Sequence, residues 1–260
     1  MNLWHQIRPF LSKFVRFMHI SYLEAKSNYQ GTRLGLLWLP VSTLLFTGML
    51  ALVFRHSDAM TITEFFLYVL SGYILWQFIQ ASIITSTDIV QRQLEFAIHN
   101  NLTLAGLFGK LLMDRLFEYG INLALLVAVI VLLSPGNVDL NLALFIPFVA
   151  IIVPTSLAVS YLVNAVTIFF PDLSTLVKTG TRFMFFASPV FWVATDRTDI
   201  RTLLVQYNPV SYYMDITRQV FGILPLQPAS WISSALVSLG LCVAGYITFV
   251  YSQNFVRNIK

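Results

Sequence analysis

The chain has 260 residues, of which 57% are hydrophobic and only 11% are charged, with a mean hydropathy of +0.73. Soluble domains normally carry about 25% charged residues, so this composition indicates an integral membrane protein. The single cysteine excludes an intrachain disulfide, a paired redox motif and a cysteine-based zinc cluster. The net charge of +4 includes no basic block on a polar face, so we expect no nucleic-acid partner.

Residues 1–30 predict an amphipathic helix that lies on the cytoplasmic membrane surface. Apolar residues recur at helical spacing from Trp4 to Tyr22, while Arg8, Lys13 and Arg16 share the opposite side. A helix with one apolar and one basic face lies along the interface instead of crossing it, and it contacts membrane lipids.

Uncharged windows of membrane-spanning length follow. About 20 apolar residues, at a rise of 1.5 Å each, cross a hydrocarbon layer of about 30 Å. The window from Phe183 to Thr195 is too short alone, but a helix that starts at Thr175 is long enough and puts Lys178 and Arg182 in its first turns, where they reach the interface. We therefore expect a single-domain, all-α membrane protein with six transmembrane helices, at 34–54, 65–87, 119–138, 142–170, 175–195 and 229–252.

The distribution of basic residues predicts the orientation of these helices. If both termini are cytoplasmic, the segments 1–33, 88–115, 171–182 and 253–260 hold 12 of the 16 Lys and Arg residues. Cytoplasmic loops are normally the ones enriched in Lys and Arg. The sequence therefore predicts a multi-pass protein with cytoplasmic N- and C-termini.

The segment 196–228 contains two short helical patterns. Ser211 is a candidate N-cap for the second, which ends near Gly222, and Asp215 and Arg218 are spaced to pair on one face. Helices of 10 to 14 residues are too short to span a membrane, so we expect a re-entrant helical hairpin between the fifth and sixth transmembrane helices. The alternative interpretation is an ordinary extracytoplasmic loop with short amphipathic helices.

The sequence lacks the residues that several classes of activity require. The predicted span cores contain no ionisable group of the kind that drives ion-coupled carriers. The segment GLFGKL at 106–111 has the wrong spacing for a phosphate-binding P-loop. Asp196 and Asp199 stand apart from other acidic residues, and no nucleophile with its base is found. We expect no catalytic, cofactor or metal site in this chain, and a separate ATPase subunit as the energy source.

Three short motifs carry a family resemblance. They are YQGTRLGLLW at 29–38, SPVF at 188–191, and Asn208-Pro209 followed by Arg218 and Gly222. Together with the surface helix and the six spans, they resemble the permease subunit of ABC-2 type polysaccharide exporters, the group that exports O-antigen, capsule and teichoic acid. The resemblance covers essentially the whole chain.

The resemblance implies a homodimer with two copies of an ABC ATPase subunit, which bind ATP and Mg. It places the protein in the bacterial cytoplasmic (inner) membrane and makes it the channel for a lipid-linked polysaccharide. In this family the ATPase contact lies between the second and third spans. The coupling residues expected there are Gln91, Arg92, Glu95 and Phe96.

The junction at 28–40 is the expected mouth for the substrate. Gly31 and Gly35, four residues apart, predict a small-residue face against which a helix or a glycolipid packs. Arg33 is either a diphosphate-binding residue or a positive-inside anchor, and Trp38 is expected at the membrane interface.

Aromatic side chains are candidates for the translocation path, because sugars commonly stack their apolar faces on aromatic rings. The path residues expected are Tyr22, Tyr29, Tyr68, Tyr73 and Trp76. The hairpin is expected to form an outer gate from Asn208, Pro209, Tyr212, Tyr213, Asp215 and Arg218.

Two alternative functions stay open at this point. The first is an ABC-2 permease for a smaller lipid or a drug. The second is a membrane enzyme of glycolipid assembly, which a cluster of carboxylates at membrane depth would have favoured.

Overall fold

The computed structural model describes residues 3–55, 60–89, 93, 99, 103–137, 139–193 and 200–258. Across these residues the chain forms helices and no strand, so the prediction of an all-α protein is confirmed. Five of the helical stretches described are long and apolar enough to cross a membrane, which makes this a multi-pass membrane protein. They are Gly35–Phe54, Ile62–Ile84, Leu104–Leu133, Leu140–Phe169 and Pro228–Tyr251.

The chain runs through helices α1 to α10 in the described regions, with three short 3-10 turns. The α-helices are α1 (Leu3–Asn28), α2 (Trp38–Phe54), α3 (Ile62–Ile84), α5 (Leu104–Leu133), α6 (Phe145–Phe169), α7 (Leu173–Ala187), α8 (Ile200–Tyr207), α9 (Pro209–Val220) and α10 (Pro228–Asn258). The 3-10 turns are η1 (Gly35–Leu37), η2 (Pro135–Asn137) and η3 (Leu140–Leu144).

Helix starts follow from local capping chemistry. At α3, the Thr61 hydroxyl accepts a hydrogen bond from the Glu64 N–H at 3.2 Å, and the Thr61 N–H donates to the Glu64 carboxylate at 2.8 Å. This reciprocal pair is a capping box, which satisfies two backbone donors at the helix end. At α9, the Asn208 side-chain oxygen accepts a hydrogen bond from the Val210 N–H at 3.0 Å, and Pro209 occupies the first helical position, where proline costs no hydrogen bond.

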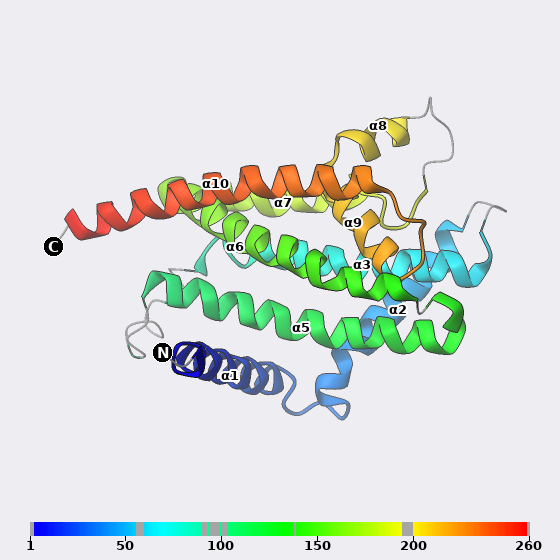
Figure 1. Ribbon diagram of the computed structural model, residues 1–260, viewed down its shortest axis with the longest axis horizontal. Helices are drawn as coiled ribbons and strands as arrows, with labels where there is room; N and C mark the ends of the chain where they lie inside the picture. The colour runs from blue at the N-terminus through cyan, green and yellow to red at the C-terminus, as the bar shows by residue number, and fades with distance from the viewer. Residues whose placement is uncertain are drawn as a thin grey trace.

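Figure 1 shows α5, α6 and α10 side by side along the long axis of the molecule, with α1 against α5 at the edge of the bundle. The first turns of α1 and the last turns of α10 lie at the same end of the bundle. Helix α3 is the most enclosed span, because 61% of its apolar window is buried, against 28% for α5 and α6. It contributes the fully buried residues Leu67, Leu70, Ile74, Leu75 and Trp76.

Helices α6 and α10 approach each other closely at a glycine. A Cβ added to Gly245 would lie 2.8 Å from the Cβ of Ala158 and 2.9 Å from its Cα. Small residues permit such close backbone approach between membrane helices. Gly240, in the same helix, has no atom within 4 Å of its Cβ position.

Helix α5 differs from its sequence prediction. It begins at Leu104 instead of Tyr119, and it contains Lys110, Asp114, Arg115 and Glu118. These four residues lie in the first half of the helix, before the uncharged stretch that begins at Tyr119, so the helix extends beyond the predicted span of 119–138. Lys110, Asp114 and Arg115 form ion pairs and hydrogen bonds with residues outside α5, which stabilise their charges there. The expectation that no ionisable residue lies in a span core stays a prediction.

The fifth predicted span is covered only in part by a described helix. Helix α7 ends at Ala187, because Ser188 precedes a proline and takes an extended conformation. At the other end, the Lys178 ammonium pairs with the Asp88 carboxylate at 3.5 Å. Helices α8 and α9 lie between α7 and α10, at the positions expected for the hairpin. A sixth span and a re-entrant hairpin stay predictions.

Candidate functional site: two adjoining grooves

A polar groove with a volume of about 350 Å³ lies between α2, α3 and α5. Its walls carry amide, hydroxyl and charged groups from α3 and α5, together with the apolar Leu39 and Ile74. The polar lining residues are Ser42, Tyr73, Gln77, Gln80, Thr85, Arg115, Glu118, Tyr119 and Asn122. For a helical membrane protein this is an unusual concentration of hydrogen-bonding groups, because polar side chains are rare within spans and mark functional paths.

Gln77 lies at the centre of one hydrogen-bond network in this groove. The Asn122 amide donates to the Gln77 side-chain oxygen at 3.1 Å, and Gln77 lies 3.4 Å from the Thr43 hydroxyl. These contacts join α2, α3 and α5 across the groove. The walls are therefore held together by polar contacts in addition to apolar packing.

Arg115 closes the groove at another point. Its guanidinium donates to the hydroxyls of Thr85 at 2.7 and 3.1 Å, Ser86 at 2.7 Å and Ser160 at 2.5 Å. Its partners therefore come from the end of α3 and from α6. Arg115 is 4% exposed but lines the groove.

An aromatic groove of about 240 Å³ adjoins the polar one, with Tyr73 and Gln80 common to both. The Tyr73 ring lies 4.7 Å from that of Phe46, and the Trp76 ring lies 5.6 Å from that of Phe185. Two predicted path residues, Tyr73 and Trp76, thus come together at one site. The lining consists of Phe46, Tyr73, Trp76, Gln80, Arg182, Phe185 and Phe186.

The other predicted path residues lie elsewhere. Tyr22, on α1, stacks edge-on against Phe117 of α5 at 6.1 Å. Tyr29 lies in the turn after α1, where burial raises the pKa of its phenol and the Glu118 carboxylate adds to the shift. Tyr68 is buried beneath Arg218. The structure therefore does not gather all five path residues into one channel lining.

The expected substrate mouth forms an elbow between α1 and α2. The Thr32 hydroxyl donates to the Tyr29 carbonyl at 2.9 Å and accepts from the Gly35 N–H at 3.1 Å. Arg33 and Trp38 are both exposed there.

The two glycines of this elbow do not form the predicted small-residue packing face. Gly31 and Gly35 have φ values of +89° and +53°, and neither has an atom within 4 Å of its Cβ position. The turn requires them for its left-handed backbone, which residues with a side chain rarely adopt. The prediction of a packing face assumed that residues 31–35 are helical, because only in a helix do residues four apart share a face.

A cluster of charges fastens α1 to α5. The Lys110 ammonium, 1% exposed, pairs with the Glu24 carboxylate of α1 and with the Asp114 carboxylate at 2.7 Å. The Ser21 hydroxyl donates to Asp114 at 2.7 Å. These contacts attach α1 to the part of α5 that lies next to the polar groove.

Among the predicted gate residues, Pro209 is exposed, Asn208, Tyr212 and Asp215 are half-buried, and Tyr213 and Arg218 are buried. Tyr212 donates a hydrogen bond to the Gln206 carbonyl of α8. Asn208 donates to the Ser188 hydroxyl at 2.8 Å and thereby ties the start of α9 to the end of α7. Arg218, by contrast, is 0% exposed, and its Nη2 donates to the Pro189 carbonyl at 2.5 Å. Its position indicates that it fastens α9 to the bundle.

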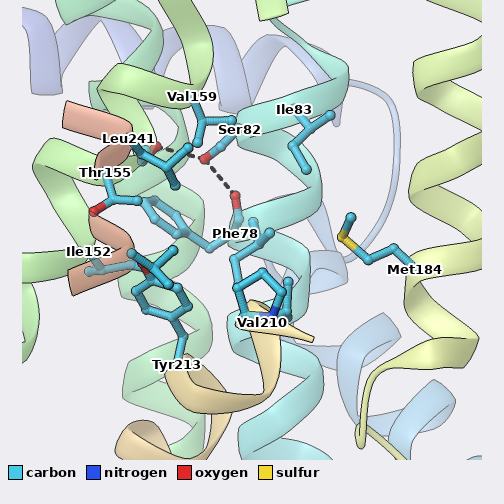
Figure 2. A pocket seen from close by; sticks show the side chains of 14 residues that line it. Phe78, Ser82, Ile83, Ile152, Thr155, Val159, Met184, Val210, Tyr213 and Leu241 are labelled. Atoms are coloured by element: carbon cyan, nitrogen blue, oxygen red, sulfur yellow. Dashed lines mark hydrogen bonds between the residues drawn. The ribbon is translucent and has the colours of Figure 1, made fainter. Parts of the chain in front are cut away.

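Tyr213, another predicted gate residue, lines an apolar cavity of about 170 Å³ between α3, α6, α7, α9 and α10 (Figure 2). Its hydroxyl shares a hydrogen bond of 2.7 Å with Ser238. The Ser82 and Ser156 hydroxyls also share one, at 2.7 Å, and Ser82 donates to the Phe78 carbonyl at 2.8 Å. The hydroxyls near this cavity therefore satisfy one another and leave an apolar surface, unlike the polar groove.

The four expected coupling residues, Gln91, Arg92, Glu95 and Phe96, lie outside the described residues. Their neighbour Asp88 is described, and its ion pair with Lys178 connects the start of this segment to α7. The coupling prediction therefore stays a prediction.

Sequence analysis missed Gln77, Gln80, Arg115, Glu118 and Asn122 as groove residues. The signal was present in their spacing. Gln77 and Gln80 are three residues apart, and Arg115, Glu118 and Asn122 follow at intervals of three and four, so each set shares one helix face. A search for polar helical faces that included the residues just before each apolar window would have found both, because Arg115 and Glu118 directly precede the window that contains Asn122.

A comparison with known proteins bears on this architecture. No family model matches the chain. The O-antigen export system permease protein RfbA of Klebsiella pneumoniae is 22% identical over 211 residues, which cover 78% of each chain. The chain is related to an O-antigen export permease. This relationship confirms the resemblance to ABC-2 type polysaccharide-export permeases, which the motifs at 29–38, 188–191 and 208–222 indicated.

Proposed function

We propose that this chain is the permease subunit of an ATP-driven exporter that carries a lipid-linked polysaccharide across the bacterial cytoplasmic (inner) membrane. The observation that carries the proposal is the pair of adjoining grooves, one polar and one aromatic, in a membrane bundle related to an O-antigen export permease. The chain itself performs no chemistry in this account, because its task is to provide a path.

The groove linings suit a glycan. Sugar hydroxyls need hydrogen-bond partners once water is removed, and Gln77, Gln80 and Asn122 supply both donors and acceptors. Sugar rings also present apolar faces that stack on aromatic side chains, which Tyr73 and Trp76 supply in the adjoining groove. A path for an entirely apolar drug would not need such a concentration of amides.

A homodimer would complete this path. The two grooves are open clefts on one subunit, and a polymer that crosses the membrane must be enclosed on all sides. Exposed apolar residues border the aromatic groove on α2 and α7, including Leu45, Met49, Phe183 and Phe186. A second copy placed against these helices would close the grooves into a channel.

Two ABC ATPase subunits, with ATP and Mg, would supply the energy on the cytoplasmic side, where both termini are proposed to lie. The segment that follows α3 is their proposed contact, through Gln91, Arg92, Glu95 and Phe96. The pair between Asp88 and Lys178 supports this assignment, because it connects that segment to α7, which lines the aromatic groove through Arg182 and Phe185.

On the opposite face we propose that α8 and α9 form the re-entrant hairpin that gates the exit. Tyr212 remains the candidate gate residue. Asn208, Tyr213 and Arg218 would anchor this gate, since they bond to residues of other helices.

Gene deletion and complementation in the source bacterium test this function. Loss of the chain should remove a surface polysaccharide and cause its lipid-linked form to accumulate on the cytoplasmic side. Complementation with the Gln77→Leu, Asn122→Leu double variant should restore much less export than the wild type. An unchanged surface glycan together with loss of drug or lipid efflux would favour the smaller-substrate alternative. Absence of the lipid-linked glycan itself would favour a membrane enzyme of glycolipid assembly.

A further inference from the structure

The buried guanidinium of Arg115 has no carboxylate partner among the residues that the structure describes. Its four hydrogen bonds all go to neutral hydroxyls. Asp114, its neighbour in sequence, is engaged by Lys110 and Ser21. Asp114 acts on the guanidinium only through longer-range electrostatic attraction, so Arg115, which is 4% exposed, has no direct ion pair to offset the cost of its burial. The Arg115 site therefore lacks a contacting anion among the described residues.

The geometry shows where a negative charge would fit. The Nε and Nη2 groups of Arg115 both donate to a single acceptor, the Thr85 hydroxyl, at 3.1 and 2.7 Å. These two parallel N–H groups form the edge of the guanidinium that matches two oxygens of a carboxylate or a phosphate. We call this pair of donors, Nε and Nη2, the guanidinium fork. The single neutral oxygen of Thr85 thus occupies a fork that is suited to two anionic oxygens.

Thr85 is also the partner that a ligand can displace. It is exposed and lines the polar groove, whereas Ser86 and Ser160 are buried behind the guanidinium. Its hydroxyl donates to the Ala81 carbonyl at 2.7 Å, a bond that it keeps when an anion takes over the guanidinium fork. The fork therefore faces the groove through a replaceable hydroxyl.

The site lies at the depth of lipid headgroups. Helix α5 is uncharged from Tyr119 to Leu133, a stretch of roughly 22 Å at the helical rise. The hydrocarbon layer is about 30 Å thick, so Arg115, about one turn before Tyr119, lies near one face of that layer. Lipid phosphates occupy this level.

We propose that Arg115 and the mouth of the polar groove bind a phosphate group, and that in the membrane this phosphate belongs to the lipid carrier of the exported glycan. The assignment of the phosphate to the carrier rests on the proposed function. Gln77, Gln80 and Asn122, further along the groove, then lie where the first sugars would follow. Glu118 lines the same groove without an ion pair to Arg115 among the described residues, so its carboxylate does not occupy the fork.

Calorimetric titration of the purified full chain in non-ionic detergent, without ATPase or glycan, tests the site. The probes are geranylgeranyl phosphate, geranylgeraniol and inorganic phosphate. The lipid phosphate should bind about tenfold more tightly than the alcohol, and Arg115→Gln should abolish that difference. Arg16→Gln, which removes an exposed arginine from α1, is the matched control and should leave it intact.

Thr85→Glu keeps the proposal testable if Arg115→Gln fails to fold. It places a carboxylate beside the fork without removing the arginine, so it should retain the wild-type melting temperature and lose the preference for phosphate. Displacement of the lipid phosphate by millimolar inorganic phosphate would support phosphate binding at the fork and show that the site also accepts free phosphate. No displacement would show that the site binds the phosphate only as part of a lipid headgroup. Equal affinity for lipid phosphate and alcohol, or an unchanged preference in Thr85→Glu, would overturn the proposal.

The proposed function and this site fail in different experiments. Binding that depends on Arg115 in a chain that exports no glycan would contradict the proposed function alone. If the chain exports glycan but Arg115→Gln does not change its preference for lipid phosphate, this inference alone would be contradicted.

Discussion

The guanidinium of Arg218 lies over the ring of Tyr68, with its Cζ 3.4 Å from the ring centroid. The same side chain pairs with Asp215 at 3.8 Å and donates to the Pro189 carbonyl, so it joins α9, α3 and the end of α7. Burial raises the pKa of the Asp215 carboxyl, while Arg218 opposes that shift. This buried cation is therefore a structural tie between three segments.

Replacement of Arg218 by leucine should destabilise the protein by about 3 kcal/mol, because it leaves Asp215 and a backbone carbonyl without their partner. For a chain of this size that is roughly a 6 to 12 °C decrease in melting temperature, measurable in detergent. Arg16→Leu, at an exposed position of α1, should change it little. Equal melting temperatures for the two variants would refute the structural role of Arg218.

The close contact of α6 and α10 makes a prediction about glycine. Gly245→Ala should lower the melting temperature, since its new Cβ would lie 2.9 Å from the Ala158 Cα and the helices must move apart. Gly240→Ala is the control in the same helix, where open space should make the change neutral or slightly stabilising. A similar response of both variants would show that the helices do not pack as described.

The ion pairs of Lys110 predict that the attachment of α1 to α5 depends on this one buried ammonium group. Lys110→Met should cost about 3 kcal/mol and increase hydrogen exchange in α1, because Asp114 loses its partner inside the bundle. Lys26→Met, an exposed position on α1, is the control. Unchanged exchange in α1 of the Lys110 variant would contradict the fastening role.

The elbow after α1 makes a prediction that depends on residue type. Gly35→Ala should destabilise the turn by about 1 kcal/mol, because its φ of +53° lies in the left-handed region. Gly35→Asn should cost less, since asparagine tolerates this region better than other residues with a side chain. If the glycine were needed for close packing, the larger asparagine would be worse than alanine. The order of the two melting temperatures therefore distinguishes the backbone explanation from the packing face predicted by the sequence.

Apolar window lengths predicted the helical class and located α2, α3, α6 and α10, because the membrane imposes a minimum length on uncharged segments. At α5 they located only the apolar second half, since the charged first half is stabilised by partners of Lys110 and Arg115 on α1, after α3 and on α6, which no local pattern reveals. The polar groove could not be predicted for the same reason, because it also depends on contacts between helices. Tyr73 and Trp76 were predicted from their chemistry, but the meeting of Gln77 with Asn122 depends on how α3 packs against α5.

The proposed export function is tested most directly by reconstitution with an ABC ATPase from the same gene cluster and the lipid-linked glycan of the same bacterium. We expect that the two proteins copurify, that the glycan stimulates ATP hydrolysis, and that ATP hydrolysis moves the glycan across the proteoliposome membrane. Failure of the ATPase to associate, or hydrolysis and transport that ignore the glycan, would contradict the exporter assignment.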